Sequence, residues 1–224
     1  MAHVMIPSGI ALILDMDGVI VDSNPVHREA WLQFNRLYGL ETTEEMQHRM
    51  YGKRNDEIVR DFFGPRLMEV EVHRRGAAKE ALYREMIAPR LEDLLVPGVR
   101  EFLREAATAP VGLATNAEPA NVDFLLDRAG LRPFFRAVVD GHQVRQPKPS
   151  PEIYLRVASL LGTDPHNCIV FEDSFSGIAA AQAAGARVVA LRTTHLEFSG
   201  VDLAVDDFRS PELRTWLEGQ RVRL

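Results

Sequence analysis

Pairs of acidic residues follow two of the short apolar runs in this 224-residue chain. Asp15 and Asp17 come after the first run, and Glu172 and Asp173 end the fourth. Carboxylate oxygens are the ligands that a hard divalent cation such as Mg²⁺ prefers. Acids at the end of an apolar strand are costly unless they are paired, solvated or metal-bound. Asp-x-Asp-Gly is also an ordinary turn sequence, so the first pair alone leaves a turn and a metal site as equal alternatives.

Groups that can hold a phosphate follow two other runs. Thr115 and Asn116 end the second run and can donate hydrogen bonds to phosphate oxygens, although the same residue types also cap helices. Lys148 lies between Pro147 and Pro149, which stiffen the backbone around it. A lysine held in this way can offset phosphate charge, whereas an isolated loop lysine is more often simply solvated.

The elements that must position these groups are short apolar strands that alternate with helical patterns. Runs that are apolar on both faces are typical of parallel strands covered by helices on both sides. The rhythm predicts an α/β fold with a doubly wound, parallel, Rossmann-like sheet. The expected strands are 10–14, 111–114, 137–139, 168–171, 188–191 and, more weakly, 203–205, and the expected helices between them are 119–129, 151–161 and 176–184.

The order of the strands brings the polar groups together. In a doubly wound sheet the chain reverses beside the first strand, so the first and fourth strands become neighbours. Asp15, Asp17 and Asp173 would then surround one point, where three carboxylates repel one another strongly without a divalent ion. Thr115 and Lys148 fall on the same edge of the sheet, and chance explains this shared placement poorly.

The stretch between the first and second strands contains no good strand pattern. It reads as four helices, at 25–38, 44–50, 55–63 and 65–86. An insertion at the carboxyl end of a strand covers the edge where ligands bind in such sheets. We therefore predict a Rossmann-like catalytic core of residues 1–22 and 94–224, and an all-helical cap domain of residues 23–93.

The ordered set of motifs resembles one family across nearly the whole chain. It is similar to the haloacid dehalogenase-like hydrolases, within the β-phosphoglucomutase-like group of phosphatases and phosphohexomutases. The segments that carry the resemblance are Asp15-Met16-Asp17-Gly18-Val19-Ile20-Val21-Asp22-Ser23, Thr115-Asn116, Lys148-Pro149 and Glu172-Asp173-Ser174.

The resemblance implies a role for each group. Asp15 would attack phosphorus and form an aspartyl-phosphate, and Asp17 would be the general acid and base. An acid at the position of Asp17 also distinguishes the chain from the dehalogenases of the family. Mg²⁺ would be the cofactor and the substrate a small phosphorylated metabolite. The implied Mg²⁺ ligands are Asp15, the Asp17 carbonyl and Asp173 with Glu172 in support, and the implied phosphate-binding residues are Thr115, Asn116 and Lys148.

The cap matches the mutase branch only in part. His27 falls where that branch has a histidine that positions the acid–base aspartate, and Lys79 falls on its substrate-contacting lysine. A solvated helix face is the alternative for both residues. The mutase branch has an arginine three residues after the cap-loop glycine, Gly52, but here that position is Asn55. Substrate contacts from the cap loop would then come from Gly52, Lys53 or Arg54.

The departure at Asn55 favours phosphatase activity over mutase activity. The leading prediction is a Mg²⁺-dependent phosphatase that hydrolyses a small phosphate monoester, such as a sugar phosphate, through an aspartyl-phosphate. The first alternative is a β-phosphoglucomutase-like phosphohexomutase, which His27 and Lys79 favour. The second is a non-catalytic protein that binds a phosphometabolite, although such a protein would be expected to have lost Asp15, Asp17 or Lys148.

Composition narrows the setting without naming a substrate. The formal net charge of −6 argues against a nucleic-acid partner, because duplex binding needs a basic face. No apolar run approaches the roughly 18 residues that a membrane-spanning helix needs. The single cysteine and the absence of a recognisable signal sequence predict a cytoplasmic protein. The oligomeric state is not visible in the sequence.

Overall fold

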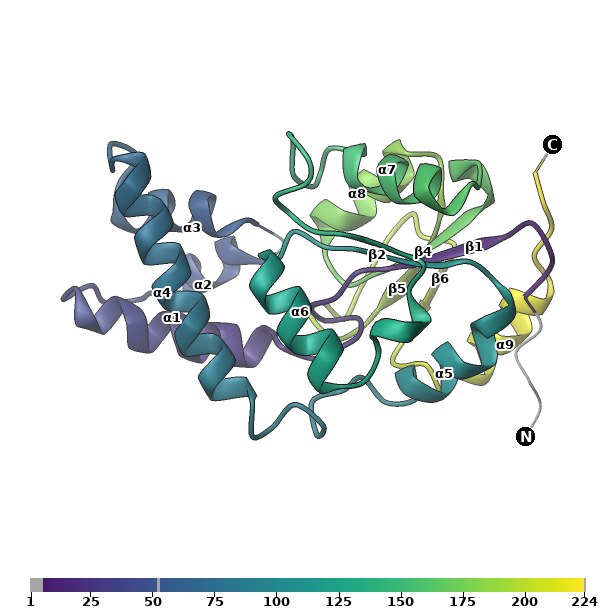
Figure 1. Ribbon diagram of the computed structural model, residues 1–224, viewed down its shortest axis with the longest axis horizontal. Helices are drawn as coiled ribbons and strands as arrows, with labels where there is room; N and C mark the ends of the chain where they lie inside the picture. The colour runs from purple at the N-terminus through teal and green to yellow at the C-terminus, as the bar shows by residue number, and fades with distance from the viewer. Residues whose placement is uncertain (1–5, 52, 224) are drawn as a thin grey trace.

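A single parallel sheet forms the centre of the molecule, as the sequence predicts (Figure 1). The computed structural model describes residues 6–51 and 53–223, and in these ranges the sheet has six strands in the order β3-β2-β1-β4-β5-β6. The order reverses at β1, which makes the sheet doubly wound. The strands are β1 (Ala11–Leu14), β2 (Val111–Ala114), β3 (Ala137–Val139), β4 (Cys168–Glu172), β5 (Arg187–Leu191) and β6 (Leu203–Val205).

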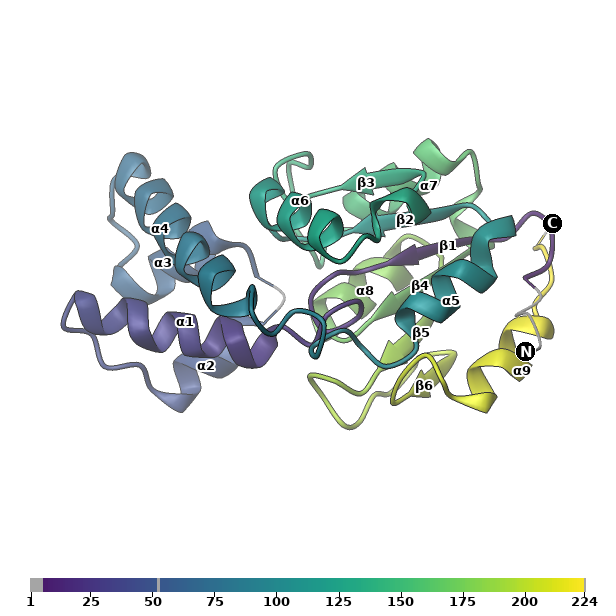
Figure 2. The ribbon, with the colours of Figure 1, turned by 60° about the horizontal axis from the view of Figure 1, so that its bottom comes forward.

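Helices cover both faces of the sheet (Figures 1 and 2). Because side chains alternate along a strand, Leu12 and Leu14 of β1 enter one apolar cluster, while Ala11 and Ile13 enter another. The first cluster is closed by α5 (Val99–Glu105), α6 (Pro119–Arg128) and α9 (Pro211–Glu218), and the second by α7 (Glu152–Leu161) and α8 (Phe175–Ala183).

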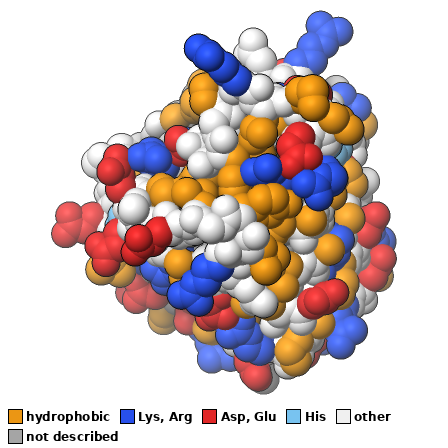
Figure 3. Space-filling model, turned by 90° about the vertical axis from the view of Figure 1, so that its left-hand side faces the viewer, with side chains coloured by type: hydrophobic (Ala, Val, Ile, Leu, Met, Phe, Trp, Pro, Cys, Tyr) orange, Lys and Arg blue, Asp and Glu red, His pale blue; other side chains and the backbone are white. Residues whose placement is uncertain are grey.

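The stretch inserted after β1, residues 23–93, lies at the carboxyl edge of the sheet (Figure 2). The regular secondary structure of its described residues is helical. Its helices share an apolar cluster of their own, centred on Trp31, Phe62 and Val72. The exposed end of this cap carries hydrophobic side chains among charged ones (Figure 3). None of the helices built from described residues is long and apolar enough to cross a membrane. The cap helices are α1 (Asn24–Leu37), α2 (Glu44–Met50), α3 (Asn55–Phe63) and α4 (Glu69–Ile87).

Two neighbouring linkers join the cap to the core. The amide of Asp22 donates to the Leu94 carbonyl at 2.8 Å, and the amide of Val96 donates to the Ile20 carbonyl at 3.0 Å. The entry to and the exit from the cap therefore form a short hydrogen-bonded ribbon, rather than two independent tethers.

Several predicted boundaries are wrong by a few residues. The last cap helix was expected from Pro65, but α4 begins at Glu69, where acidic residues in the first turn complement the helix dipole. Glu172 was expected after the fourth strand, yet it is the last residue of β4 because it pairs with Ala190 of β5. The short helices α5 and α9 were not predicted at all. Three 3-10 turns also connect elements, at Ala106–Thr108, Arg132–Phe134 and Pro165–Asn167.

Candidate active site

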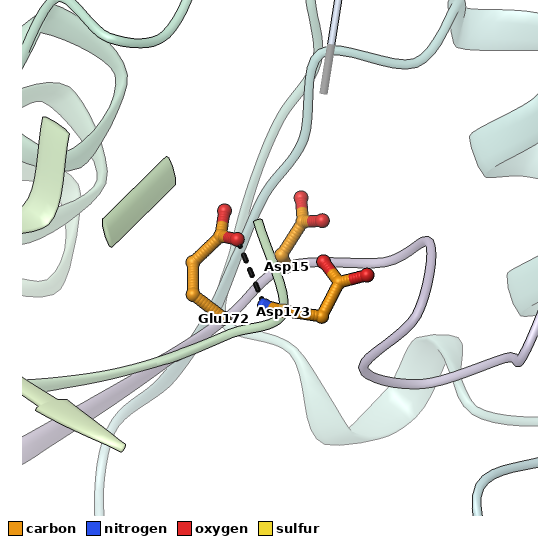
Figure 4. Close-up of side chains that lie close together, drawn as sticks. All are labelled: Asp15, Glu172 and Asp173. Carbon is orange, nitrogen blue, oxygen red and sulfur yellow. Dashed lines mark hydrogen bonds between the residues drawn. The ribbon is translucent and has the colours of Figure 1, made fainter. Parts of the chain in front are cut away.

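Three carboxylates meet where β1 and β4 end. The two strands pair in register, with Leu14 opposite Phe171, so the residues that follow them arrive at the same point. Asp15, Glu172 and Asp173 each bring an oxygen to within 4.8 Å of the others, and all three residues are buried. Figure 4 shows the carboxylates grouped together, with the Asp173 amide donating to Glu172. Asp15 and Asp173 therefore meet as strand order predicts, but the third carboxylate of the cluster is Glu172, whereas Asp17 was predicted in that place.

Lys148 enters this acidic cluster from the loop between β3 and α7. Its ammonium donates to Asp15 Oδ1 at 2.8 Å, to Glu172 Oε1 at 2.6 Å and to the Ala114 carbonyl at 3.0 Å. Its side chain is buried, which excludes the solvated loop lysine that the sequence left open. A lysine this far from water is stable as a cation only because carboxylates surround it.

Glu172 accepts hydrogen bonds at both of its oxygens. Oε1 receives Lys148 and the Tyr154 hydroxyl, which lies 2.8 Å away. Oε2 receives the amides of Asp173 and Ser174, at 2.9 and 3.0 Å, and also the Ser174 hydroxyl. Gly177 of α8 makes room for this carboxylate, because a Cβ there would lie 1.8 Å from Oε1. Glu172 thus fixes both Lys148 and the turn that carries Asp173.

The acids differ in how readily they ionise. Burial raises the pKa of Asp15 to about 7, although Lys148 opposes the rise. Burial and the charges of Glu172 and Asp15 hold the pKa of Asp173 well above its usual range. Burial also acts on Glu172, but Lys148 and the backbone amides outweigh it and lower its pKa. The site concentrates more negative charge than one ammonium can balance.

The surroundings of Asp173 leave it little freedom. A Cβ at Gly18 would lie 1.9 Å from Asp173 Oδ2, so only glycine fits beside this carboxylate, and its φ of +77° also favours glycine. The Thr194 hydroxyl donates to the same oxygen, and the Asn24 amide lies 3.2 Å from it. Loops after β1 and β5, together with the start of α1, therefore hold Asp173 in place.

The cluster fits a divalent cation of the Mg²⁺ type. Its donors are carboxylate oxygens, which are the ligands such ions prefer. Burial raises the pKa values of Asp15 and Asp173 even though the Lys148 ammonium lies 2.8 Å from Asp15, and a divalent cation would supply the further positive charge that stabilises both carboxylates. Because Glu172 already accepts several hydrogen bonds at each oxygen, Asp15 and Asp173 have the freer oxygens for a metal.

Asp17 points away from the cluster and toward the cap. Its Oδ1 accepts a hydrogen bond from Ser23 at 2.5 Å and lies 3.4 Å from His27 Nε2. Burial raises the pKa of Asp17, but His27 and Ser23 outweigh this effect, and the net shift is downward. The ring of His27 stacks on Tyr83 at 3.7 Å, and its Nδ1 lies 2.8 Å from Lys79 Nζ. His27 and Lys79 are thus linked to the acid–base candidate.

Lys79 is a buried cap residue, not part of a solvated helix face. Its ammonium pairs with Glu80 at 2.7 Å and lies 4.8 Å from the centre of the Trp31 ring. Glu80 in turn accepts from Asn121 of α6 at 2.6 Å, which joins cap to core. Trp31 packs in the cap cluster, and it also lines the pocket described below.

Thr115 and Asn116 do not cap the helix that follows them. The N-cap of α6 is Glu118, so the capping alternative for the two residues is wrong. Thr115 is buried, and its hydroxyl oxygen accepts from the Ala117 amide at 3.1 Å, which leaves the hydroxyl proton available to an acceptor. Asn116 Oδ1 lies 3.4 Å from the Lys148 amide.

A pocket of about 730 Å³ opens between these residues and the cap. The cap loop contributes Lys53 and Asn55 to its lining, and Gly52 lies outside the described residues. Arg54 is not among the residues that line it, since its guanidinium donates to the Val144 carbonyl at 2.8 Å. Core residues that line the pocket include Asp15, Asp17, Thr115, Asn116, Lys148 and Asp173.

Some residues of the site carried no sequence signal. Tyr154 is a common residue type at an ordinary helical position, and only the folded chain brings it to Glu172. Ser23 ends the first segment that carries the family resemblance, but no local pattern assigned it to Asp17. Glu118 offered one local clue, because glutamate is a poor N-cap residue just before a helix-starting proline.

Comparison with known proteins identifies the family. Residues 11–185 match the model of the haloacid dehalogenase-like hydrolases, and the chain belongs to this family. It is 34% identical over 182 residues to the fructose-1-phosphate phosphatase YqaB of Escherichia coli, which covers 81% of this chain and 95% of the relative. The family contains phosphatases and phosphomutases, and the chain is an enzyme of this kind.

Solved structures agree with this assignment. A β-phosphoglucomutase from Clostridium difficile superposes with a TM-score of 0.82 at 26% identity, covering 95% of this chain and 97% of that one. A variant of CbbY from Rhodobacter sphaeroides in complex with xylulose-1,5-bisphosphate superposes with a TM-score of 0.77 at 26% identity, covering 91% and 95%. The cap and the sheet therefore belong to a known arrangement.

Proposed function

We propose that this enzyme is a Mg²⁺-dependent phosphatase that hydrolyses a small phosphate monoester, with sugar phosphates as the substrate class. One observation carries the proposal: Asp15 lies in a buried acidic cluster with Lys148, while Asp17 is held apart on the cap side of the same pocket. This arrangement separates a nucleophile from an acid–base group. The similarity to a fructose-1-phosphate phosphatase supports the substrate class.

The proposed reaction has two displacements at phosphorus. In the first, an Asp15 oxygen forms a bond to phosphorus as the bond to the sugar oxygen breaks, and Asp17 gives a proton to that oxygen. In the second, water attacks the aspartyl-phosphate, Asp17 takes a proton from the water, and the bond to Asp15 breaks to release phosphate. Phosphoryl transfer depends mainly on positioning and charge stabilisation, which a buried Lys148 and the Thr115 hydroxyl would supply.

Asp17 must change protonation state during this cycle. The low pKa that His27 and Ser23 impose makes the resting carboxyl an anion, which suits the base step. A phosphate dianion in the pocket adds negative charge nearby and raises that pKa, so substrate binding favours the proton that the acid step needs.

Mg²⁺ would be held by Asp15, the Asp17 carbonyl and Asp173, with Glu172 in support. When bound, the ion neutralises charge that develops on the transferring phosphoryl group. Lys148 and the ion would together balance the excess negative charge that burial concentrates at this edge of the sheet.

A phosphate-release screen tests the proposal. Purified enzyme with Mg²⁺ is expected to release inorganic phosphate steadily from at least one small sugar phosphate. Asp15→Asn should lower kcat by a factor of about 10³ or more, because loss of a nucleophile leaves only binding and charge effects. Metal removal with EDTA should abolish turnover, and added Mg²⁺ should restore it. Full activity in Asp15→Asn would refute the nucleophile assignment.

A phosphohexomutase is the second candidate, because Lys79 contacts His27 and His27 contacts Asp17. Such an enzyme would convert β-glucose 1-phosphate to glucose 6-phosphate, and a bisphosphate would stimulate it. Scoring isomer formation and free phosphate in the same reaction separates the two activities. Phosphate lost to water without isomer formation would decide for the phosphatase.

A further inference from the structure

Glu118 precedes the first turn of α6, but its side chain does not cap that helix. It occupies the N-cap position, yet its side chain makes no capping hydrogen bond. Serine, threonine, aspartate and asparagine cap helices far better than glutamate does. Helix N-termini also attract anions, including phosphate groups. Here the carboxylate of Glu118 already places a negative charge at that position.

The Glu118 side chain instead reaches the cap. Asn55 Nδ2 donates to Glu118 Oε1 at 2.8 Å, and both residues line the pocket. Among residues 6–51 and 53–223, Glu118 Oε2 and Asn55 Oδ1 accept no hydrogen bond, and both of these atoms can only accept. This pair, which we call the Asn55–Glu118 wall, therefore offers acceptors to a ligand.

Glu118 follows Thr115 by three residues on one loop, so the wall lies within about 10 Å of the proposed phosphate position. A phosphorylated sugar bound at Thr115 would thus extend its other end toward the wall. Hydroxyl groups can donate to the two acceptor oxygens. A second phosphate, at pH 7, can only bring negative charge against the carboxylate of Glu118.

The cations of the pocket do not offset this acid. Lys148 is bound by Asp15 and Glu172, and Lys79 is bound by Glu80. Lys53 is exposed on the cap loop, where its ammonium remains hydrated. Lys53 would attract any phosphate ester, whether it carries one phosphate or two, so it provides little discrimination between them.

We propose that the Asn55–Glu118 wall selects monophosphates whose far end carries hydroxyl groups, and that it excludes sugar bisphosphates. This selectivity rests on the proposed phosphatase function, because it concerns the substrate of the same site. A related structure holds a bisphosphate sugar, so bisphosphates are the relevant competitors.

The test compares two substrates that differ by one distal phosphate, fructose 1-phosphate and fructose 1,6-bisphosphate. The wild-type enzyme should favour the monophosphate in kcat/KM by about tenfold or more. Glu118→Gln keeps the size of the side chain and its contact with Asn55 but removes the charge, and it should reduce this ratio about tenfold. Glu118→Lys should reverse the preference. Glu218→Gln makes the same chemical change on exposed α9 and should leave the ratio unchanged.

A binding measurement separates the two proposals. Calorimetry of both sugars with Asp15→Asn, with and without Glu118→Gln, reports selectivity without turnover. If the wild-type enzyme is active and Glu118→Gln has the same ratio of kcat/KM between the two sugars, selection by the wall is refuted. The phosphatase proposal is then unaffected. An enzyme that turns over no monoester would remove the phosphatase proposal, while a binding preference that Glu118→Gln narrows would still support selection by the wall. Equal binding of both sugars by Asp15→Asn would refute selection by the wall.

Discussion

At the scale of single residues, the acids of the site differ in how many hydrogen bonds their carboxylates accept. Glu172 accepts from Lys148, Tyr154 and three donors of the following turn. Asp15 accepts from Lys148 at one oxygen, and its other oxygen accepts no hydrogen bond from the described residues. The carboxylate of Glu172 is therefore a positioning group, whereas that of Asp15 keeps an oxygen available for phosphorus.

The pKa of Asp15 leads to a prediction about stability and pH. Its folded pKa of about 7 exceeds its ordinary value of 3.8, so between these values the folded chain binds more protons than the unfolded chain. In metal-free buffer the contribution of Asp15 to the free energy of unfolding, taken as the difference between the wild-type enzyme and Asp15→Asn, should therefore fall as pH rises from about 4 to 7, by roughly 3 kcal/mol. The pKa of Asp173 is also raised, so this residue adds to the fall in the free energy of unfolding with pH. Urea titrations with EDTA across this range measure it.

Two controls decide whether the slope comes from this cluster. Asp15→Asn should flatten much of it, because the titrating group is gone. Saturating Mg²⁺ should also flatten it, since a bound cation stabilises the ionised acids. Asp17 has a lowered pKa, so its contribution is present above pH 3.8 and is lost only below it. The same slope in the wild-type enzyme and in Asp15→Asn, both in metal-free buffer, would contradict the burial argument for Asp15.

At the scale of elements, short strands and their order were predictable because continuous apolar runs and βαβ rhythm are local signals. The start of α4 was not, because Pro65 fits a helix N-terminus as well as it fits the turn in which it lies. Short α5 and α9 were missed because seven or eight residues give few helical repeats, and neither helix has the side-chain N-cap hydrogen bond that Thr43 gives to α2, which is equally short and was predicted.

Close packing of α8 on Glu172 leads to a prediction for two helical glycines. Glycine-to-alanine changes within helices usually stabilise by up to about 1 kcal/mol. Gly177→Ala should instead destabilise by about 1–3 kcal/mol and reduce activity, because its Cβ would overlap Glu172 Oε1. Gly76→Ala in α4 is the matched control, since its Cβ would meet only ordinary contacts at 3.4 Å or more. Thermal unfolding of both variants gives the comparison, and equal shifts would argue against the steric role.

At the scale of the whole molecule, the contacts between cap and core escaped prediction. Asn55 with Glu118 and Glu80 with Asn121 are each far apart in sequence, and they meet only once the two parts adopt one orientation. No pattern within a single helix reports such an orientation. We propose that residues 23–93 form a cap that moves over a core of residues 1–22 and 94–224, with hinges near 22–23 and 94–98.

The contact of Asn121 with two cap residues, Glu80 and Arg84, provides a test of cap movement. Asn121 is buried on α6, donates to Glu80 of α4 at 2.6 Å and accepts from Arg84 at 2.7 Å. Asn121→Ala leaves those two charged groups without their core partner, which costs roughly 1–3 kcal/mol of the closed arrangement. The open population should then rise about tenfold or more.

Hydrogen exchange without ligand measures that opening directly, at the linkers and along the facing sides of α4 and α6. Asn167→Ala is the matched control, because Asn167 is also buried and hydrogen-bonded, but its partner is Arg223 within the core. It should destabilise the fold without selectively exposing the linkers. If Asn121→Ala exchanges in the cap and linkers no faster than Asn167→Ala does, the cap and core move as one rigid unit. The hinge proposal then fails while the chemistry of the site is untouched.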